Sequence, residues 1–172
     1  MEKQYTLSIF TENSPGVLQR ITIMFTRRKI NIESLAVSET ERKGISRFTI
    51  VICCDSSLIH KIARQIQRII EVLHVDVFED ADLYHRELSL IRVQVNSEEE
   101  HKEILAISQQ FEARVTLDKG NDIILEAVDT RSNTDALVAA LMPYRIIEFV
   151  RSGRIALPWA GTTHEEAIRL AL

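Results

Sequence analysis

The stretch Glu12-Asn13-Ser14-Pro15-Gly16-Val17-Leu18 stands between a strand-like run and the first helical run of the chain. Ser14 can cap the following helix, and Pro15 fits the first helical turn because its missing N–H would have no partner there. Gly16 lacks the side chain that would keep a ligand away from the backbone. No acidic residue occurs between Ser14 and Ile30, so nothing in this helix neutralises the free N–H groups at its start. The stretch therefore predicts either an anion site suited to a carboxylate or an ordinary strand-to-helix turn.

Hydrophobic periodicity on either side of this turn predicts four strands and two helices in the first half of the chain. The predicted order is strand, helix, strand, strand, helix, strand, which is the split βαβ or ferredoxin-like unit. The expected strands are Tyr5–Thr11, Asn31–Glu39, Ile45–Cys54 and Val72–Phe78, and the expected helices are Pro15–Lys29 and Ser56–Ile70.

The same order returns after Glu79-Asp80-Ala81-Asp82, and the hairpin glycines Gly44 and Gly120 hold equivalent places in the two halves. We therefore predict an α+β protein of two tandem ferredoxin-like domains, at residues 1–82 and 83–172, the second ending in a short helical tail. The elements expected in the second half are the strands Leu88–Val95, Arg114–Asp118, Ile123–Val128 and Ile146–Val150, and the helices Glu98–Phe111 and Thr134–Leu141.

The first helix of the second half begins very differently from that of the first half. Its sequence is Asn96-Ser97-Glu98-Glu99-Glu100, in which Ser97 and Glu100 are spaced as a capping box. Three carboxylates in the first turn would repel an incoming carboxylate by about 1 kcal/mol or more per pair in wet surroundings. A carboxylate site is therefore expected only in the first half.

Composition places the chain among folded proteins, since hydrophobic residues make up 45% of its 172 residues and charged residues 27%. Apolar runs such as Ile50–Cys54 are too short to cross a bilayer, and the first residues lack a signal-peptide pattern. We expect a cytoplasmic protein with no membrane partner. The only cysteines are the neighbours Cys53 and Cys54, which point to opposite faces of a strand and are expected to be small buried residues.

Catalytic, metal and nucleic-acid sites find little support in the sequence. None of the five histidines stands in a metal-binding spacing, and no G-x-S-x-G motif occurs. The stretch Lys43–Ile50 resembles an RNA-contacting strand, but Ile45 and Arg47 stand where stacking aromatic residues are expected. With a net charge of −4, the chain is not expected to bind nucleic acid.

Three segments together resemble one family. Residues 12–20 resemble the first loop of ACT domains, and Asn31-Ile32-Glu33-Ser34-Leu35 is similar to the N-I-E-S-L segment of the small, regulatory subunit of acetolactate synthase. Val150-Arg151-Ser152-Gly153 is similar to the A-R-[ST]-G end of the second domain of that family. The resemblance extends from Leu7 to about Gly153.

The resemblance implies a non-catalytic subunit that binds the catalytic large subunit, raises its activity and makes it sensitive to branched-chain amino acids, commonly valine. It implies a homodimer through the ACT domains, with the amino acid between the domains of two chains. It also implies that this chain binds no cofactor, and that thiamine diphosphate, Mg and FAD belong to the catalytic subunit. Carried over by position, the ligand-binding residues are Asn13, Gly16, Val17, Leu18, Asn31 and Ile32.

Two alternatives remain open on the sequence. One is a free-standing ACT amino-acid sensor that acts on another enzyme or on transcription, and the other is an enzyme on a ferredoxin-like scaffold. From the residues alone, Asn31 is better explained as a simple left-handed turn residue after Lys29-Ile30 than as a ligand contact. The segment after Gly153, with a capped helix expected at Thr163–Leu170, has no counterpart in the family pattern.

Overall fold

A computed structural model describes residues 2–159, which form two compact units. The first unit contains residues 2–84 together with 154–159, and the second contains residues 85–153. Sequence analysis grouped residues 154–159 with the second domain, whereas the structure packs them with the first. The helix expected at Thr163–Leu170 lies outside the described residues.

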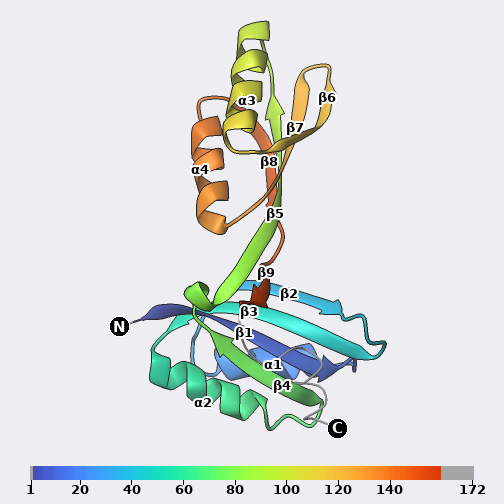
Figure 1. The fold of residues 1–172 in the computed structure, drawn as a ribbon, viewed down its shortest axis with the longest axis vertical. Coiled ribbons are helices and arrows are strands. Elements are labelled where there is room, and N and C mark those ends of the chain that lie inside the picture. Colours follow the sequence, from blue (N-terminus) through green and yellow to red (C-terminus); the bar gives the residue numbers. More distant parts are fainter. Residues whose placement is uncertain (1, 160–172) are drawn as a thin grey trace. The chain divides into compact units, whose positions relative to one another are not determined.

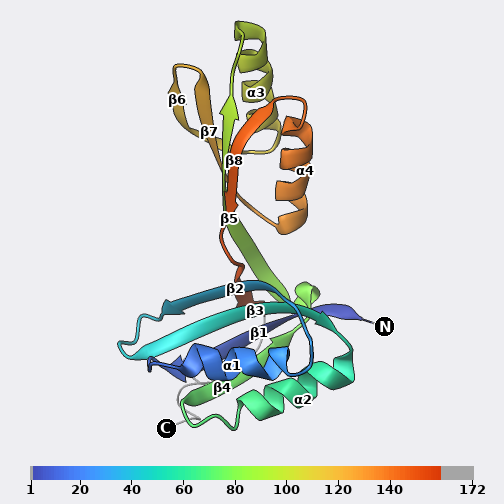
Figure 2. The ribbon, with the colours of Figure 1, turned by 180° about the vertical axis from the view of Figure 1, so that it is seen from behind.

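The first unit is the predicted βαββαβ arrangement (Figure 1). Its antiparallel sheet has the strand order β2-β3-β1-β4, and both helices cover one face of the sheet (Figure 2). The elements are β1 (Lys3–Glu12), α1 (Val17–Thr26), β2 (Ile32–Glu39), β3 (Ile45–Cys54), α2 (Ser56–Ile66) and β4 (Val72–Phe78). A 3₁₀ turn, η1 (Asp80–Asp82), follows.

The core of this unit lies between the sheet and its helices. Alternate residues of β1 and β3 face the helices, as the two-residue period of a strand requires. The helices α1 and α2 each bury one apolar stripe against these strand residues, as the 3.6-residue period of a helix requires. The largest fully buried side chains here are Leu7, Ile9, Ile21, Phe25, Ile50, Ile52, Ile59, Ile62 and Ile66. Burial of these side chains holds the first helix, and the loop before it, in place on the sheet.

The start of α1 differs from the prediction. Gly16, in the left-handed conformation with φ 84°, is the N-cap, and no side chain caps the helix. The proposed capping by Ser14 was therefore wrong, and Pro15 precedes the helix instead of lying in its first turn. The helix also ends early, because Lys29 takes a left-handed φ of 56° that turns the chain toward β2.

The sheet face away from the helices is covered in part by residues 154–159. Arg154 is 3% exposed, and its guanidinium donates hydrogen bonds to Thr6 Oγ1 (3.0 Å), Gln4 Oε1 (3.1 Å) and Asp80 Oδ1 (2.7 Å). Its backbone N–H donates to Ser34 Oγ at 2.8 Å. Arg154 thus joins strands β1 and β2 to the turn that ends the first domain.

Further contacts tether the rest of this segment, which includes β9 (Ile155–Pro158). Arg47 donates hydrogen bonds to Ser8 Oγ at 3.0 Å and to the Ala156 carbonyl at 2.8 Å. The Trp159 N–H donates to the Asp82 carbonyl at 3.0 Å, and its ring meets that of Tyr84 edge-on with centroids 5.5 Å apart. The polar residues on this face are therefore covered by residues 154–159, which we call the strap.

The second unit repeats the topology, with the strand order β6-β7-β5-β8. Its elements are β5 (Leu83–Gln94), α3 (Glu98–Gln110), β6 (Arg114–Lys119), β7 (Asp122–Asp129), α4 (Arg131–Leu141) and β8 (Arg145–Arg151). Its core contains Ile91, Val93, Ile104, Ile123, Leu125, Leu137 and Leu141. The predicted α+β class and the two ferredoxin-like units are confirmed.

The two cysteines of β3 point to opposite faces, as expected. Cys54 is buried in the core, but Cys53 is exposed, so the expectation that both are buried was wrong for Cys53. Desolvation raises the pKa of both thiols. Within residues 2–159, no helix is long and apolar enough to cross a membrane.

Candidate functional site

The loop between β1 and α1 is anchored at its β1 end by backbone hydrogen bonds. The Asn13 N–H donates to the Gly44 carbonyl of the β2–β3 hairpin at 2.7 Å, and the Ser14 N–H donates to the Glu12 carbonyl at 2.9 Å. The Glu12 N–H in turn donates to the Glu71 carbonyl at 2.8 Å. The loop is therefore placed by two neighbouring backbone segments, the β2–β3 hairpin and the segment before β4, and its geometry does not depend on a side-chain cap.

The helix start at Gly16 keeps unused donors. The first hydrogen bond that closes a helical turn runs from the Arg20 N–H to the Gly16 carbonyl at 3.1 Å, so the N–H groups of Leu18 and Gln19 have no acceptor within the helix. The first turn contains no acidic residue. This end of α1 therefore keeps its positive partial charge, as predicted.

Arg20, a cation near this helix start, is paired with a carboxylate. Arg20 donates from Nη2 to Glu71 Oε1 at 2.6 Å, which ties α1 to the segment before β4. This pair was not singled out from the sequence, because its partners lie far apart along the chain. It leaves the backbone N–H groups as the donors at the start of the helix.

The predicted site residues differ in how far their side chains are exposed to solvent. Asn13 and Gly16 are exposed in the loop, while Leu18 is 43% exposed. Val17 is 2% exposed, so its side chain belongs to the core and only its backbone faces the site. Apart from its two chain neighbours, no heavy atom lies within 4 Å of the position that a Cβ would take at Gly16, which leaves the approach to the backbone open.

Asn31 and Ile32 lie at the other end of the sheet. Ile32 pairs with Ile52, which pairs with Tyr5, whereas Glu12, next to the loop, pairs with Ile45. The seven residue steps from Tyr5 to Glu12 correspond to roughly 23 Å along the strand. Within one chain, Asn31 is therefore too far away to share a small ligand with Asn13.

The backbone of Asn31 rules out the alternative explanation given for it. Among the described residues other than glycine, only Lys29 and Glu112 have positive φ, so Asn31 is not a left-handed turn residue. The left-handed position that sequence analysis assigned to Asn31 belongs to Lys29. Asn31 is exposed just before β2 and is available for contacts outside its own chain.

The equivalent helix start in the second unit already has carboxylates of its own chain in its first turn. The Glu100 N–H donates to Ser97 Oγ at 3.1 Å, and Glu98, Glu99 and Glu100 fill the first turn. The Glu100 carboxylate accepts from the Asn96 N–H at 2.8 Å, and not from the Ser97 N–H as a capping box requires. A pocket of about 470 Å³ lies here, but the helix end supplies its own anions.

The fold and the glycine-bearing loop define a chain whose first half is an ACT domain. The family described as "AHAS small subunit-like ACT domain" matches residues 7–74. The family described as "Small subunit of acetolactate synthase" matches residues 86–159. The two matches together cover most of the described residues.

Similar proteins agree with these matches. The chain is 37% identical over 155 residues to the acetolactate synthase small subunit of Mycobacterium bovis, covering 90% of this chain and 92% of that one. It is 34% identical to the probable acetolactate synthase small subunit of Archaeoglobus fulgidus, covering 90% and 96%. The crystal structure of the Thermotoga maritima small subunit superposes with a TM-score of 0.84 at 27% identity, covering 93% and 99%. The chain belongs to the acetolactate synthase small-subunit family.

Proposed function

We propose that this chain is a non-catalytic regulatory subunit that binds the catalytic large subunit of acetolactate synthase, raises its activity and makes it responsive to a branched-chain amino acid, valine foremost. The observation that carries the proposal is the difference between the two helix starts: α1 keeps free N–H groups and no acidic residue, whereas α3 is filled by glutamates. The match of residues 86–159 to the synthase small subunit favours this role over a free-standing ACT sensor.

The chemistry of the loop suits an amino acid. Backbone N–H groups from residue 16 onward would bind its carboxylate, and the amide oxygens of Asn13 and Asn31 would accept hydrogen bonds from its ammonium group. The half-exposed side chain of Leu18 offers an apolar surface to a branched tail. The proposed ligand-binding residues are thus Asn13, Gly16, Val17 through its backbone, Leu18, Asn31 and Ile32.

The separation of Asn13 from Asn31 along the sheet supports a site made by two chains. In a two-fold pair of ACT domains, the loop of one chain faces the Asn31 end of its partner, and the reverse contact completes a second site. We therefore propose a homodimer with an amino acid at each seam. A ligand there controls the synthase by binding one arrangement of the dimer better than another, and an allosteric coupling of about 1–3 kcal/mol is sufficient.

We propose that the reaction of the synthase takes place on the catalytic large subunit. Thiamine diphosphate, Mg²⁺ and FAD are proposed to reside on the catalytic subunit. In the described part of the chain, no group of three or more His, Cys, Asp or Glu side chains is arranged to hold a metal ion. We propose that both subunits act in the cytoplasm.

Replacing Asn31 with histidine tests this function, because the proposed ligand contact is separate from the surface that engages the catalytic subunit. The variant is expected to activate the synthase normally but to shift the valine concentration for half inhibition upward by about fivefold or more, since a hydrogen bond of ~1 kcal/mol is lost and the larger ring intrudes. Acetolactate production by mixtures of the two subunits across a valine series measures both effects. An unchanged midpoint, or parallel loss of activation in a folded variant, would contradict the proposal.

A further inference from the structure

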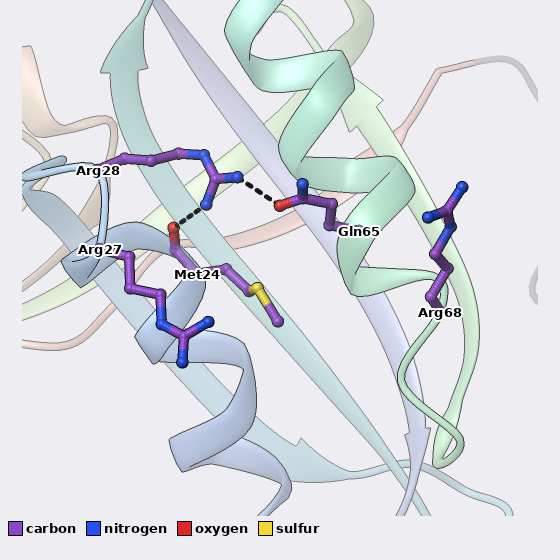
Figure 3. Close-up of a pocket in the computed structure, with 5 residues that line it drawn as sticks. All are labelled: Met24, Arg27, Arg28, Gln65 and Arg68. Carbon is purple, nitrogen blue, oxygen red and sulfur yellow. Dashed lines mark hydrogen bonds between the residues drawn. The ribbon is translucent and has the colours of Figure 1, made fainter.

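A second concave site lies at the opposite end of α1 from the glycine loop. It is a pocket of about 510 Å³ lined by Met24, Arg27, Arg28, Gln65 and Arg68 (Figure 3). Arg27 and Arg28 directly follow α1, and Arg68 follows the C-terminal end of α2. The two helix ends therefore bring the adjacent Arg27 and Arg28 to the same pocket as Arg68, which is distant from them in sequence.

One of the three arginines is fixed in position. Arg28 donates from Nη1 to the Met24 carbonyl at 2.8 Å and from Nη2 to Gln65 Oε1, so that its guanidinium bridges α1 and α2 (Figure 3). The bond to Met24 offsets the negative partial charge at the end of α1. The Met24 side chain lies between the helices and adds an apolar surface. This part of the pocket is thus formed before any ligand binds.

The pocket carries positive charge without a counter-charge. None of its lining residues is acidic, and within residues 2–159 neither Arg27 nor Arg68 forms an ion pair. Elsewhere in this acidic chain, arginines such as Arg20 and Arg154 are paired with carboxylates. Three positive charges that line one pocket, with no carboxylate among them, favour an anion there.

We propose that this pocket binds the phosphate groups of a small multiply charged anion. Guanidinium groups match phosphate oxygens with paired hydrogen bonds, and no described residue accepts a hydrogen bond from the guanidinium of Arg27 or Arg68. A concave pocket walled by two helices suits a small molecule better than a flat protein surface does. The ten residues of α1, which span about 15 Å, separate this pocket from the glycine loop, so the two sites can be tested independently.

The test uses the full-length chain and inorganic pyrophosphate in calorimetry at low ionic strength. Pyrophosphate is expected to bind, and the double variant R27Q/R68Q is expected to weaken binding by about tenfold or more, because both unpaired guanidinium groups are removed. The control variant R42Q removes an exposed arginine from the β2–β3 turn and is expected to bind as the wild type does. A nucleoside diphosphate is the second arm: tighter binding than pyrophosphate would add a contact from the nucleoside, and equal binding would assign recognition to the phosphates alone.

Three results would overturn the proposal. The first is that pyrophosphate does not bind at millimolar concentration. The second is that R42Q weakens pyrophosphate binding as much as R27Q/R68Q does. The third is that polyglutamate binds in a way that depends on Arg27 and Arg68, whereas pyrophosphate does not bind. The last result would assign the pocket to an acidic protein surface instead. Circular dichroism of both variants confirms that the comparison is made between folded chains.

Discussion

Replacing Gly16 with aspartate is expected to abolish measurable valine binding while the chain remains folded. Gly16 has a φ of 84°, so any other residue there pays a backbone cost of about 1 kcal/mol. Apart from its two chain neighbours, an added Cβ would meet no heavy atom within 4 Å, so no clash of the Cβ adds to this cost. The variant therefore tests the site and not the fold.

Charge is the main reason for the expected loss. An aspartate at the helix start would compete for the free N–H groups and repel the ligand carboxylate, at a cost of about 2 kcal/mol or more, or about thirtyfold in affinity. Gly16→Asn is the matched control, because it adds the same bulk in the same backbone conformation without the charge. Calorimetry with valine should show a clear loss for aspartate and a smaller one for asparagine.

Equal binding by Gly16→Asp and the wild type would remove the helix start from consideration as the site. If Gly16→Asp lowers the number of valine sites but leaves the affinity of the remaining sites unchanged, the second unit also binds valine. The glutamates of α3 argue against the second unit, since they already fill the first turn of its helix.

Replacing Arg154 with methionine is expected to cause the largest loss of stability. The buried guanidinium donates to Thr6, Gln4 and Asp80, and removing it leaves Thr6, which is 1% exposed, without that donor. Loss of a charged hydrogen-bond donor from such a position costs about 2–4 kcal/mol. The strap should therefore detach from the sheet at a lower urea concentration than in the wild type.

The fluorescence of Trp159 reports this detachment, because it is the single tryptophan of the chain and lies in the strap beside Tyr84. Arg154→Lys keeps the charge but cannot reach all three acceptors at once, and an intermediate loss is expected. Arg42→Met, at an exposed turn, serves as the control for loss of a positive charge. A midpoint for Arg154→Met within error of the wild type would show that the strap does not depend on this residue.

Most elements could be predicted from local pattern. The bounds of β3 and β4 agree with the predictions because both strands are rich in β-branched residues and are limited by turns. The repeated order of elements and the paired hairpin glycines were sufficient to predict two ferredoxin-like units. The strap could not be predicted in this way, because the burial of Arg154 depends on partners such as Thr6 and Asp80 that are distant in sequence.

Some structural features of the proposed site could be predicted from the sequence. The lack of acidic residues in the first turn of α1 is visible in the sequence, but the local pattern favoured Ser14 as the cap, whereas the left-handed backbone of Gly16 takes that place. The distance between the loop and Asn31 follows from topology. β1 and β2 both pair antiparallel with β3 and so run in the same direction, which places the end of one and the start of the other at opposite ends of the sheet.

Valine binding by a mixed dimer of Gly16→Asp and Asn31→His chains is the most direct test of a site shared between two chains. With different affinity tags on the two variants, the mixed dimer can be purified after co-expression and titrated by calorimetry. One seam of this dimer carries both substitutions and the other carries neither, so we predict wild-type affinity at half the number of sites, while each variant alone binds weakly or not at all. A mixed dimer that binds no better than its parents would contradict the account, because both substitutions would then act within one chain.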